Sequence, residues 1–152
     1  NALLSLLDIK LRESIREDMS GSYGIQVGGQ LIGYPEESYE ISIEFGCEPG
    51  REEELFAAVL KVIEKVKNGE ITPTDIEKLR ENYRRERETG LRNNNWWLSQ
   101  IVTKEMQEIP LTTIEDGEHI PSLITAQKLS SLARGYLNTS NYVKAVLIPA
   151  KK

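Results

Sequence analysis

The chain has 152 residues, of which 39% are hydrophobic, and 19 lysine and arginine residues against 24 aspartate and glutamate residues give it a net charge of −5. This length and composition fit one globular domain with a sizeable core, and the acidic balance disfavours a nucleic-acid partner. The chain has one histidine, His119, and one cysteine, Cys47. These two residues are too few for a self-sufficient zinc centre, which needs three or four such ligands. A single cysteine also excludes an internal disulfide framework.

A helix is predicted from Ala2 to about Asp18. Apolar residues recur there at every fourth position, and charged residues occupy the positions between them, as on an amphipathic helix; the stripe is Leu3, Leu7, Leu11 and Ile15. The apolar run 2–7 is too short to span a membrane and lacks the basic leader of a signal peptide. Because the first residue is Asn rather than Met, we expect the chain to be part of a longer polypeptide.

A β-hairpin with one buried and one wet face is predicted next, because the apolar period changes to two after Ser20-Gly21-Ser22. A turn is expected at 34–37. The pair Gly28-Gly29 within the first strand predicts a bulge or a close approach of another backbone. The residues of the buried face are Ile25, Val27 and Leu31 on the first strand and Tyr39, Ile41, Ile43 and Phe45 on the second.

The remainder of the sequence predicts mainly helices. Thr72 is a good helix cap, with Pro73 at the first helical position and Asp75 three residues after the cap. The last helix has Leu129, Leu132, Ala133 and Tyr136 on one side. In chain order the elements are a helix at 51–67, a helix at 72–89, an apolar stretch at 96–106 after a break at 93–95, a long loop at 110–121, a helix at 125–137 and a closing strand at 142–148. This order predicts an α+β fold in which helices cover one face of a mainly antiparallel sheet.

Several stretches together resemble the C-terminal half of the pitrilysin/insulinase family of zinc peptidases, also called inverzincins. In residues 11–25, an L-R-E sequence precedes S-G-S-Y-G-I, where the family has an L-R-E followed by S-G-x-Y-G-V. Further matches fall in the family's order and span nearly the whole chain; they are F-G-C-E-P at 45–49, I-T-P-T-D-I-E-K-L at 71–79, N-W-W-L-S-Q at 95–100 and N-Y-V-K-A-V-L-I-P at 141–149.

The resemblance implies an architecture of repeated α+β units whose two halves close over a proteolytic chamber, as in processing peptidases. In the family, the N-terminal half carries H-x-x-E-H, which binds zinc and activates water. No H-x-x-E-H occurs here. We therefore expect residues 1–152 to form one non-catalytic C-terminal unit of a bacterial zinc metalloendopeptidase. The first strand and helices of the family's unit are expected to be missing from it. We expect no cofactor in this chain and zinc in the parent enzyme.

The expected partners are the N-terminal catalytic half of the same polypeptide, or a partner subunit, and a peptide substrate; neither nucleic acid nor a membrane is expected. Two alternatives stay open. One is a non-catalytic scaffold or partner subunit of a two-chain peptidase, and the other is an unrelated α+β binding module. We expect a soluble protein, and one unpaired cysteine fits either the cytosol or the bacterial periplasm, which is the compartment we favour.

The resemblance also implies two substrate-contacting residues, Arg16 and Tyr23. In the family, an Arg and a Tyr seven positions later reach across the chamber toward the substrate near the zinc, and Arg16 and Tyr23 fit those positions. Arg is always charged and Tyr keeps its phenolic proton at neutral pH, so both can donate a hydrogen bond to a peptide carbonyl or a developing oxyanion. The structural alternative is that Arg16 pairs with Glu13 on a solvated helix and Tyr23 simply begins a strand.

Other reactive residue types have simpler explanations. Cys47 at a strand end is expected to be a small buried hydrophobe rather than a nucleophile paired with His119. The acidic segment 115–119, with Asp116, Glu118 and His119, is expected to be a wet loop rather than a metal site.

The arginine-rich segment 80–92 predicts a solvated helix face, because Glu81 with Arg85 and Glu88 with Arg92 are i,i+4 pairs in the favourable order. Trp96-Trp97 could form a peptide-stacking platform, but adjacent helical residues point about 100° apart. We therefore expect at least one of the two indoles in the core.

Overall fold

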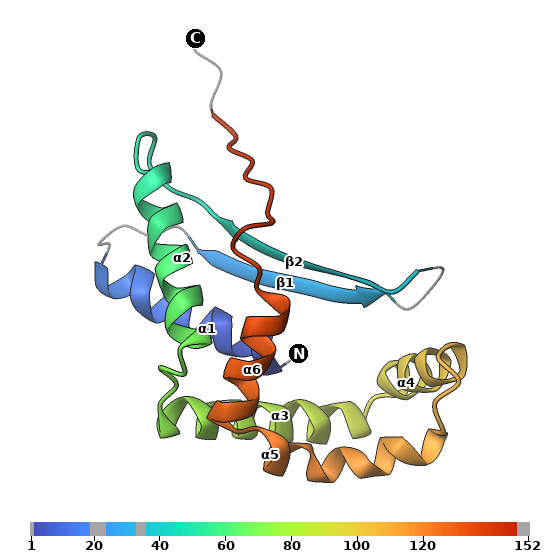
Figure 1. The fold of residues 1–152 in the computed structure, drawn as a ribbon. Helices are drawn as coiled ribbons and strands as arrows, with labels where there is room; N and C mark the ends of the chain where they lie inside the picture. Colours follow the sequence, from blue (N-terminus) through green and yellow to red (C-terminus); the bar gives the residue numbers. More distant parts are fainter. Residues whose placement is uncertain (1, 19–23, 33–35, 149–152) are drawn as a thin grey trace.

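The computed structural model describes residues 2–18, 24–32 and 36–148 and shows the predicted α+β fold, a two-stranded antiparallel sheet with helices on one face (Figure 1). The elements are α1 (Ala2–Asp18), β1 (Ile25–Ile32), β2 (Ser38–Phe45), α2 (Glu52–Lys67), α3 (Pro73–Leu91), α4 (Asn94–Met106), the 3-10 helix η1 (Leu111–His119), α5 (Ile120–Leu123) and α6 (Ala126–Tyr136). The helix predicted first and the hairpin are thus confirmed.

Helix α1 is the centre of the core. It packs against β1, α2, α3 and α6. The side chains of Leu6, Leu7 and Leu11 are 0% exposed, and Ile15 is 2% exposed. Apolar residues of α2 and of the start of α3 are buried around this stripe, namely Leu55, Val59, Val62, Ile63, Val66, Ile76 and Leu79.

The hairpin pairs without interruption from Ile25 opposite Phe45 to Ile32 opposite Ser38, so the prediction of a bulge at Gly28-Gly29 is wrong. The prediction of a close approach is confirmed. A Cβ atom on Gly29 would lie 2.9 Å from the Glu40 carbonyl oxygen and 3.0 Å from Leu4 Cδ1. A glycine at this position therefore lets α1 lie directly on β1.

The start of α3 follows the predicted capping pattern. The Thr72 side chain accepts a hydrogen bond from the Asp75 backbone N–H, and the Asp75 carboxylate accepts one from the Thr72 backbone N–H, which completes a capping box with Pro73 in the first turn. Two orphan N–H groups of the helix start are thereby satisfied. The cap fixes where α3 begins and places Asp75 beneath α1.

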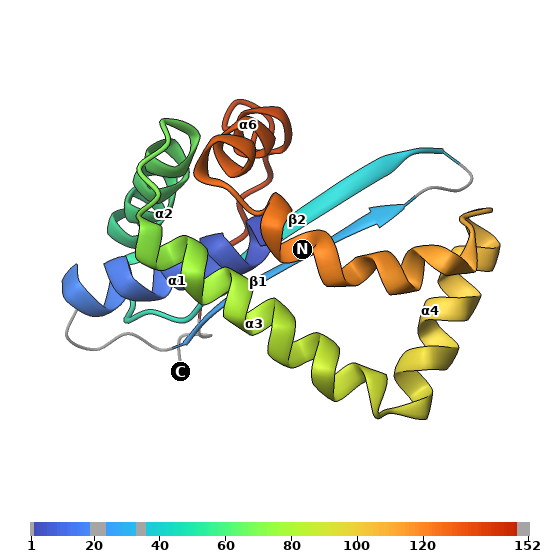
Figure 2. The same ribbon diagram turned by 90° about the horizontal axis from the view of Figure 1, so that it is seen from below.

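The distal half of α3, α4 and η1 form an arm that leaves the core, and η1 returns along it toward α5 (Figure 2). Asn93 caps α4, which confirms the break at 93–95. The prediction of a long loop at 110–121 is wrong, because η1 and α5 fill that range. Arg87 on α3 donates to the Ile114 carbonyl oxygen at 3.0 Å, and the Ile114 side chain is buried, so tertiary contacts hold a helical turn there.

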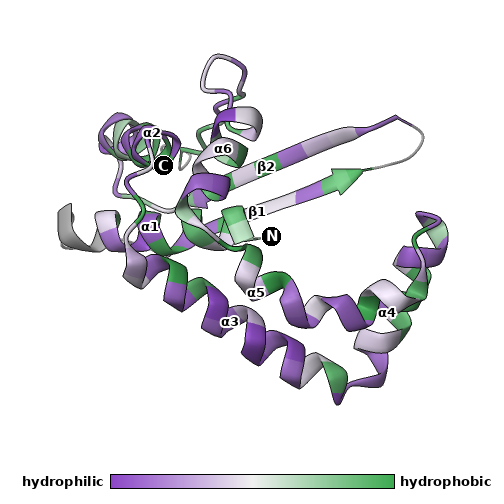
Figure 3. Ribbon diagram, turned by 60° about the horizontal axis from the view of Figure 1, so that its bottom comes forward, coloured by the Kyte–Doolittle hydropathy of each residue, from purple (hydrophilic) through white to green (hydrophobic). Residues whose placement is uncertain are grey.

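Both indoles of Trp96-Trp97 lie on the arm, and neither is buried, so the expectation that one belongs to the core is wrong. Trp96 is half-buried against Gly90, and Trp97 Nε1 donates to the Leu91 carbonyl oxygen at 3.0 Å. The two rings make an edge-to-face contact with centroids 5.3 Å apart. They stabilise the corner between α3 and α4. Figure 3 shows the contrast in hydropathy between the hydrophilic α3 and the more hydrophobic α4.

The prediction of a closing strand at 142–148 is wrong, because these residues are not paired with any described strand. Lys144 pairs with Glu53 and stands over the Phe56 ring, which also contacts Tyr142. These contacts hold the segment along α2 instead of at an edge of the hairpin. Its apolar residues are left in solvent, and Leu147 is 100% exposed.

Truncation of the α1 stripe is expected to destabilise the whole fold. Leu7→Ala should lower the free energy of unfolding by about 2–5 kcal/mol, because a fully enclosed leucine leaves a cavity. Urea denaturation followed by circular dichroism measures this change. Leu147→Ala is the matched control and should change the stability by less than about 0.5 kcal/mol. Equal effects of the two substitutions would contradict the central role of α1.

Candidate functional site

The two residues carried over from the family resemblance are Arg16, within α1, and Tyr23, two positions before β1 in the sequence. Arg16 belongs to the last turn of α1, but its side chain lies outside the described residues, and Tyr23 lies outside them altogether. Close to them in the sequence, Ile15 and Ile25 are 2% and 4% exposed and belong to the same core. The end of α1 and the start of β1 lie on the same side of the molecule (Figure 1).

An ion pair orients the helix that carries Arg16. Lys10 Nζ on α1 lies 2.7 Å from Asp75 Oδ2 on α3, and the Asp75 side chain is 3% exposed. The same oxygen accepts hydrogen bonds from the Thr72 backbone N–H at 2.7 Å and from Thr72 Oγ1 at 2.8 Å. One carboxylate thus links the cap of α3 to the polar side of α1.

Burial raises the pKa of Asp75, but the hydrogen bonds from Lys10 and Thr72 outweigh it, so the pKa lies below its usual value. Asp75 is therefore charged at neutral pH. On the next turn of α1, Glu13 accepts a hydrogen bond from Lys78 of α3 at 2.8 Å, which is a second link between the same two helices.

The other reactive residue types do not assemble into a catalytic or metal centre. Cys47 is half-buried and packs against the core, and His119 lines an open cleft of about 430 Å³ between α3 and α5. Within the described residues, no group of three or more His, Cys, Asp or Glu side chains could hold a metal ion. Part of the arginine-rich segment is solvated as predicted, with Arg85–Glu81 at 2.8 Å and Arg92–Glu88 at 2.6 Å. The prediction is wrong for Arg80 and Arg87, which are half-buried and donate to backbone carbonyls of Pro121 and Ile114.

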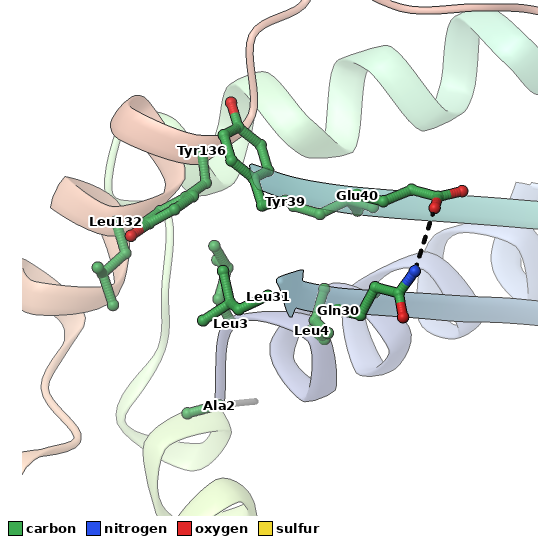
Figure 4. A pocket seen from close by; sticks show the side chains of 11 residues that line it. Ala2, Leu3, Leu4, Gln30, Leu31, Tyr39, Glu40, Leu132 and Tyr136 are labelled. Atoms are coloured by element: carbon green, nitrogen blue, oxygen red, sulfur yellow. Dashed lines mark hydrogen bonds between the residues drawn. The ribbon is translucent and has the colours of Figure 1, made fainter. Parts of the chain in front are cut away.

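An apolar groove that the sequence did not predict lies between the start of α1, the distal end of the hairpin and α6 (Figure 4). Its volume is about 280 Å³. Four of its residues were expected in the core from periodicity, but they are exposed: Leu31, Tyr39, Leu132 and Tyr136. The pattern identified the correct faces of the strands and of α6. It could not show that this end of the core is left open.

Two solved protease structures share this fold. The periplasmic protease PqqL from Escherichia coli matches 90% of the chain with a TM-score of 0.70 and 21% sequence identity. A protease from Helicobacter pylori matches 91% of it with a TM-score of 0.69 and 17% identity. No protein-family model and no curated protein sequence matches the chain.

The chain spans only a small part of both proteases, 15% of PqqL and 35% of the Helicobacter pylori protein. At these identities the likeness establishes a shared fold.

None of the helices in the described parts of the chain combines the length and the apolar character that a bilayer crossing requires.

The link between Lys10 and Asp75 should be visible in the pH dependence of stability. Because the folded-state pKa of Asp75 is lowered, its contribution is fully present above the unfolded pKa of about 4 and is lost as the pH falls through the folded value. Asp75→Asn should cost about 2–4 kcal/mol at pH 7, since it leaves Lys10 unpaired and weakens the cap of α3.

Urea titrations at neutral and acidic pH test this expectation, and the difference between wild type and Asp75→Asn should shrink below about pH 4. The control is Glu77→Gln, which changes an exposed residue two positions further along α3. A difference that stays constant with pH would show that Asp75 acts only through packing.

Proposed function

We propose that the chain is a non-catalytic C-terminal unit of a bacterial zinc metalloendopeptidase of the pitrilysin type, which closes the proteolytic chamber and contacts the peptide substrate. The observation that carries the proposal is the match of nine-tenths of this chain to a minor part of two proteases. A unit of this kind would be one component of a larger enzyme. The ordered family motifs along the chain support the same assignment.

The chemistry of the chain supports a non-catalytic role. Zinc does not fit the residues present, because the sequence has one histidine and no H-x-x-E-H, and the described residues offer no cluster of metal ligands. The zinc and the residues that activate water would belong to the absent half. No chemical step of the reaction is therefore assigned to a metal held by this chain.

Arg16 and Tyr23 are proposed as hydrogen-bond donors to the bound peptide. A guanidinium and a phenol hydroxyl can both stabilise a carbonyl oxygen as it gains negative charge, and such donors act best when their position is fixed before the substrate binds. The buried neighbours Ile15 and Ile25, together with the Lys10–Asp75 link, would hold the two positions at the chamber wall.

The proposed compartment is the bacterial periplasm. The Escherichia coli protein with the same fold is a periplasmic protease. One cysteine that forms no disulfide is compatible with that compartment.

The 152-residue chain by itself is expected neither to bind stoichiometric zinc nor to cleave peptides. Equilibrium dialysis with zinc and a quenched fluorescent peptide assay measure these two properties. Zinc binding at one ion per chain together with peptide cleavage would overturn the proposal.

Within the complete peptidase, Tyr23→Phe and Arg16→Ala should each lower kcat by about 10²–10³-fold without changing the free energy of unfolding. The matched controls are Tyr142→Phe and Arg12→Ala, an exposed tyrosine and an exposed arginine of α1. Both controls should keep the wild-type kinetics. Wild-type kinetics of the Tyr23 and Arg16 variants would remove those residues from the mechanism.

The gene that encodes the chain distinguishes a single-chain enzyme from a two-chain one. An H-x-x-E-H upstream in the same reading frame would support the proposal as stated. Its presence only in a neighbouring reading frame would make this chain a separate partner subunit.

A further inference from the structure

We propose that Asn68 is a site of spontaneous deamidation that the folded chain protects and the locally opened chain exposes. Asn68-Gly69 is the one Asn-Gly pair in the sequence, and it lies at the corner where α2 leads into α3 (Figure 1). Asparagine is among the thermally labile residues, and a following glycine has no side chain to obstruct its backbone nitrogen. The inference concerns the stability of the folded unit and does not depend on its part in proteolysis.

The reaction needs only the chain and water. The backbone nitrogen of Gly69 attacks the side-chain carbonyl carbon of Asn68, and a new N–C bond forms between them. The bond from that carbon to the side-chain nitrogen breaks, and ammonia leaves with the proton of the Gly69 amide. Water then opens the resulting succinimide ring at either of its carbonyl carbons. One opening gives aspartate. The other gives isoaspartate, in which the main chain runs through the former side chain and is longer by a methylene group.

The folded geometry keeps the attacking nitrogen away from its target. Asn68 is exposed and is the C-cap of α2, with φ −80° and ψ −2°. At a ψ near zero, the Gly69 nitrogen eclipses the backbone nitrogen of Asn68 and is turned away from Cβ, which carries the side-chain carbonyl. Ring closure requires the Gly69 nitrogen to eclipse Cβ instead. The Gly69 N–H is also occupied, because it donates to the Val66 carbonyl oxygen at 3.1 Å.

Contacts on both sides of Asn68 hold this geometry. Gly69 has a φ of +85°, and the Glu70 N–H donates to the Lys65 carbonyl oxygen at 3.0 Å, which together with the bond from Gly69 forms a Schellman motif. From α6, Arg134 Nη1 donates to the Lys67 carbonyl oxygen at 2.6 Å. Deamidation therefore requires the end of α2 to open, and its rate should follow the population of locally opened chains.

A chain modified to isoaspartate at position 68 does not fit the same fold. The residues that follow the pair are fixed, since Ile71 is 9% exposed and belongs to the core and Thr72 caps α3. An added methylene group lengthens the backbone between α2 and these contacts, and a close-packed interior does not absorb such a change without loss of contacts. Modification of an opened chain thus opposes its refolding.

The test incubates the 152-residue chain at mildly alkaline pH, both folded and unfolded in guanidinium chloride, and follows Asn68 by peptide mapping and mass spectrometry. Deamidation should be at least about tenfold faster in the unfolded chain than in the folded chain. Asn138, which precedes Thr139, is the internal control and should react much more slowly than Asn68 in the unfolded chain. Equal rates at Asn68 in the two samples, or no modification of the unfolded chain, would overturn the proposal.

A pair of arginine variants tests the contact from α6. Arg134→Ala removes the hydrogen bond to the Lys67 carbonyl and should raise the rate in the folded chain about two- to tenfold, with the rate in the unfolded chain unchanged. Arg85→Ala is the matched control, because Arg85 is exposed and pairs with Glu81 of its own helix, and it should react as wild type. Circular dichroism verifies that both variants are folded. A wild-type rate in folded Arg134→Ala would overturn the protection by α6.

The two reaction products provide a second measurement. Asn68→Asp reproduces the product with an ordinary main chain and should unfold at nearly the wild-type urea midpoint, because the changed side chain is exposed. Chains with isoaspartate at position 68, separated after incubation in denaturant, should unfold at a clearly lower urea concentration. Equal midpoints for the two products would overturn the inferred effect on refolding. These measurements do not involve proteolysis, so their outcome leaves the kinetic test of Arg16 and Tyr23 unaffected, and the reverse also holds.

Discussion

The burial of the apolar stripe of α1 is the constraint on which the other elements depend. β1, α2, α3 and α6 all pack on this helix, and a two-stranded hairpin is at best marginally stable without such support. Apolar burial is non-directional and does not by itself set how a helix is turned about its axis. The Lys10–Asp75 pair supplies that restriction, because it joins the polar side of α1 to the capped start of α3.

The same constraint explains why the apolar groove exists. α1 covers the hairpin as far as Gly29, where Leu4 meets the strand, but β1 continues to Ile32 and β2 begins at Ser38. The far end of the hairpin therefore extends past the helix, with Leu31 and Tyr39 still on the face that α1 covers elsewhere. α6 reaches this end only through Tyr136 and Leu132. The groove results from this incomplete cover.

Local patterns in the sequence predicted what local physics decides. The four-residue spacing of α1 and the capping box at Thr72 both involve residues within a turn or two of one another. The incorrect predictions concerned segments whose structure depends on residues far away in the sequence. Arg87 holds η1 from 27 residues away, and Lys144 reaches Glu53 across 91 residues, so a helical turn replaced an expected loop and an expected strand stayed unpaired. For the candidate site, the resemblance supplied Arg16 and Tyr23, whereas the groove could be recognised only from which apolar residues remained exposed.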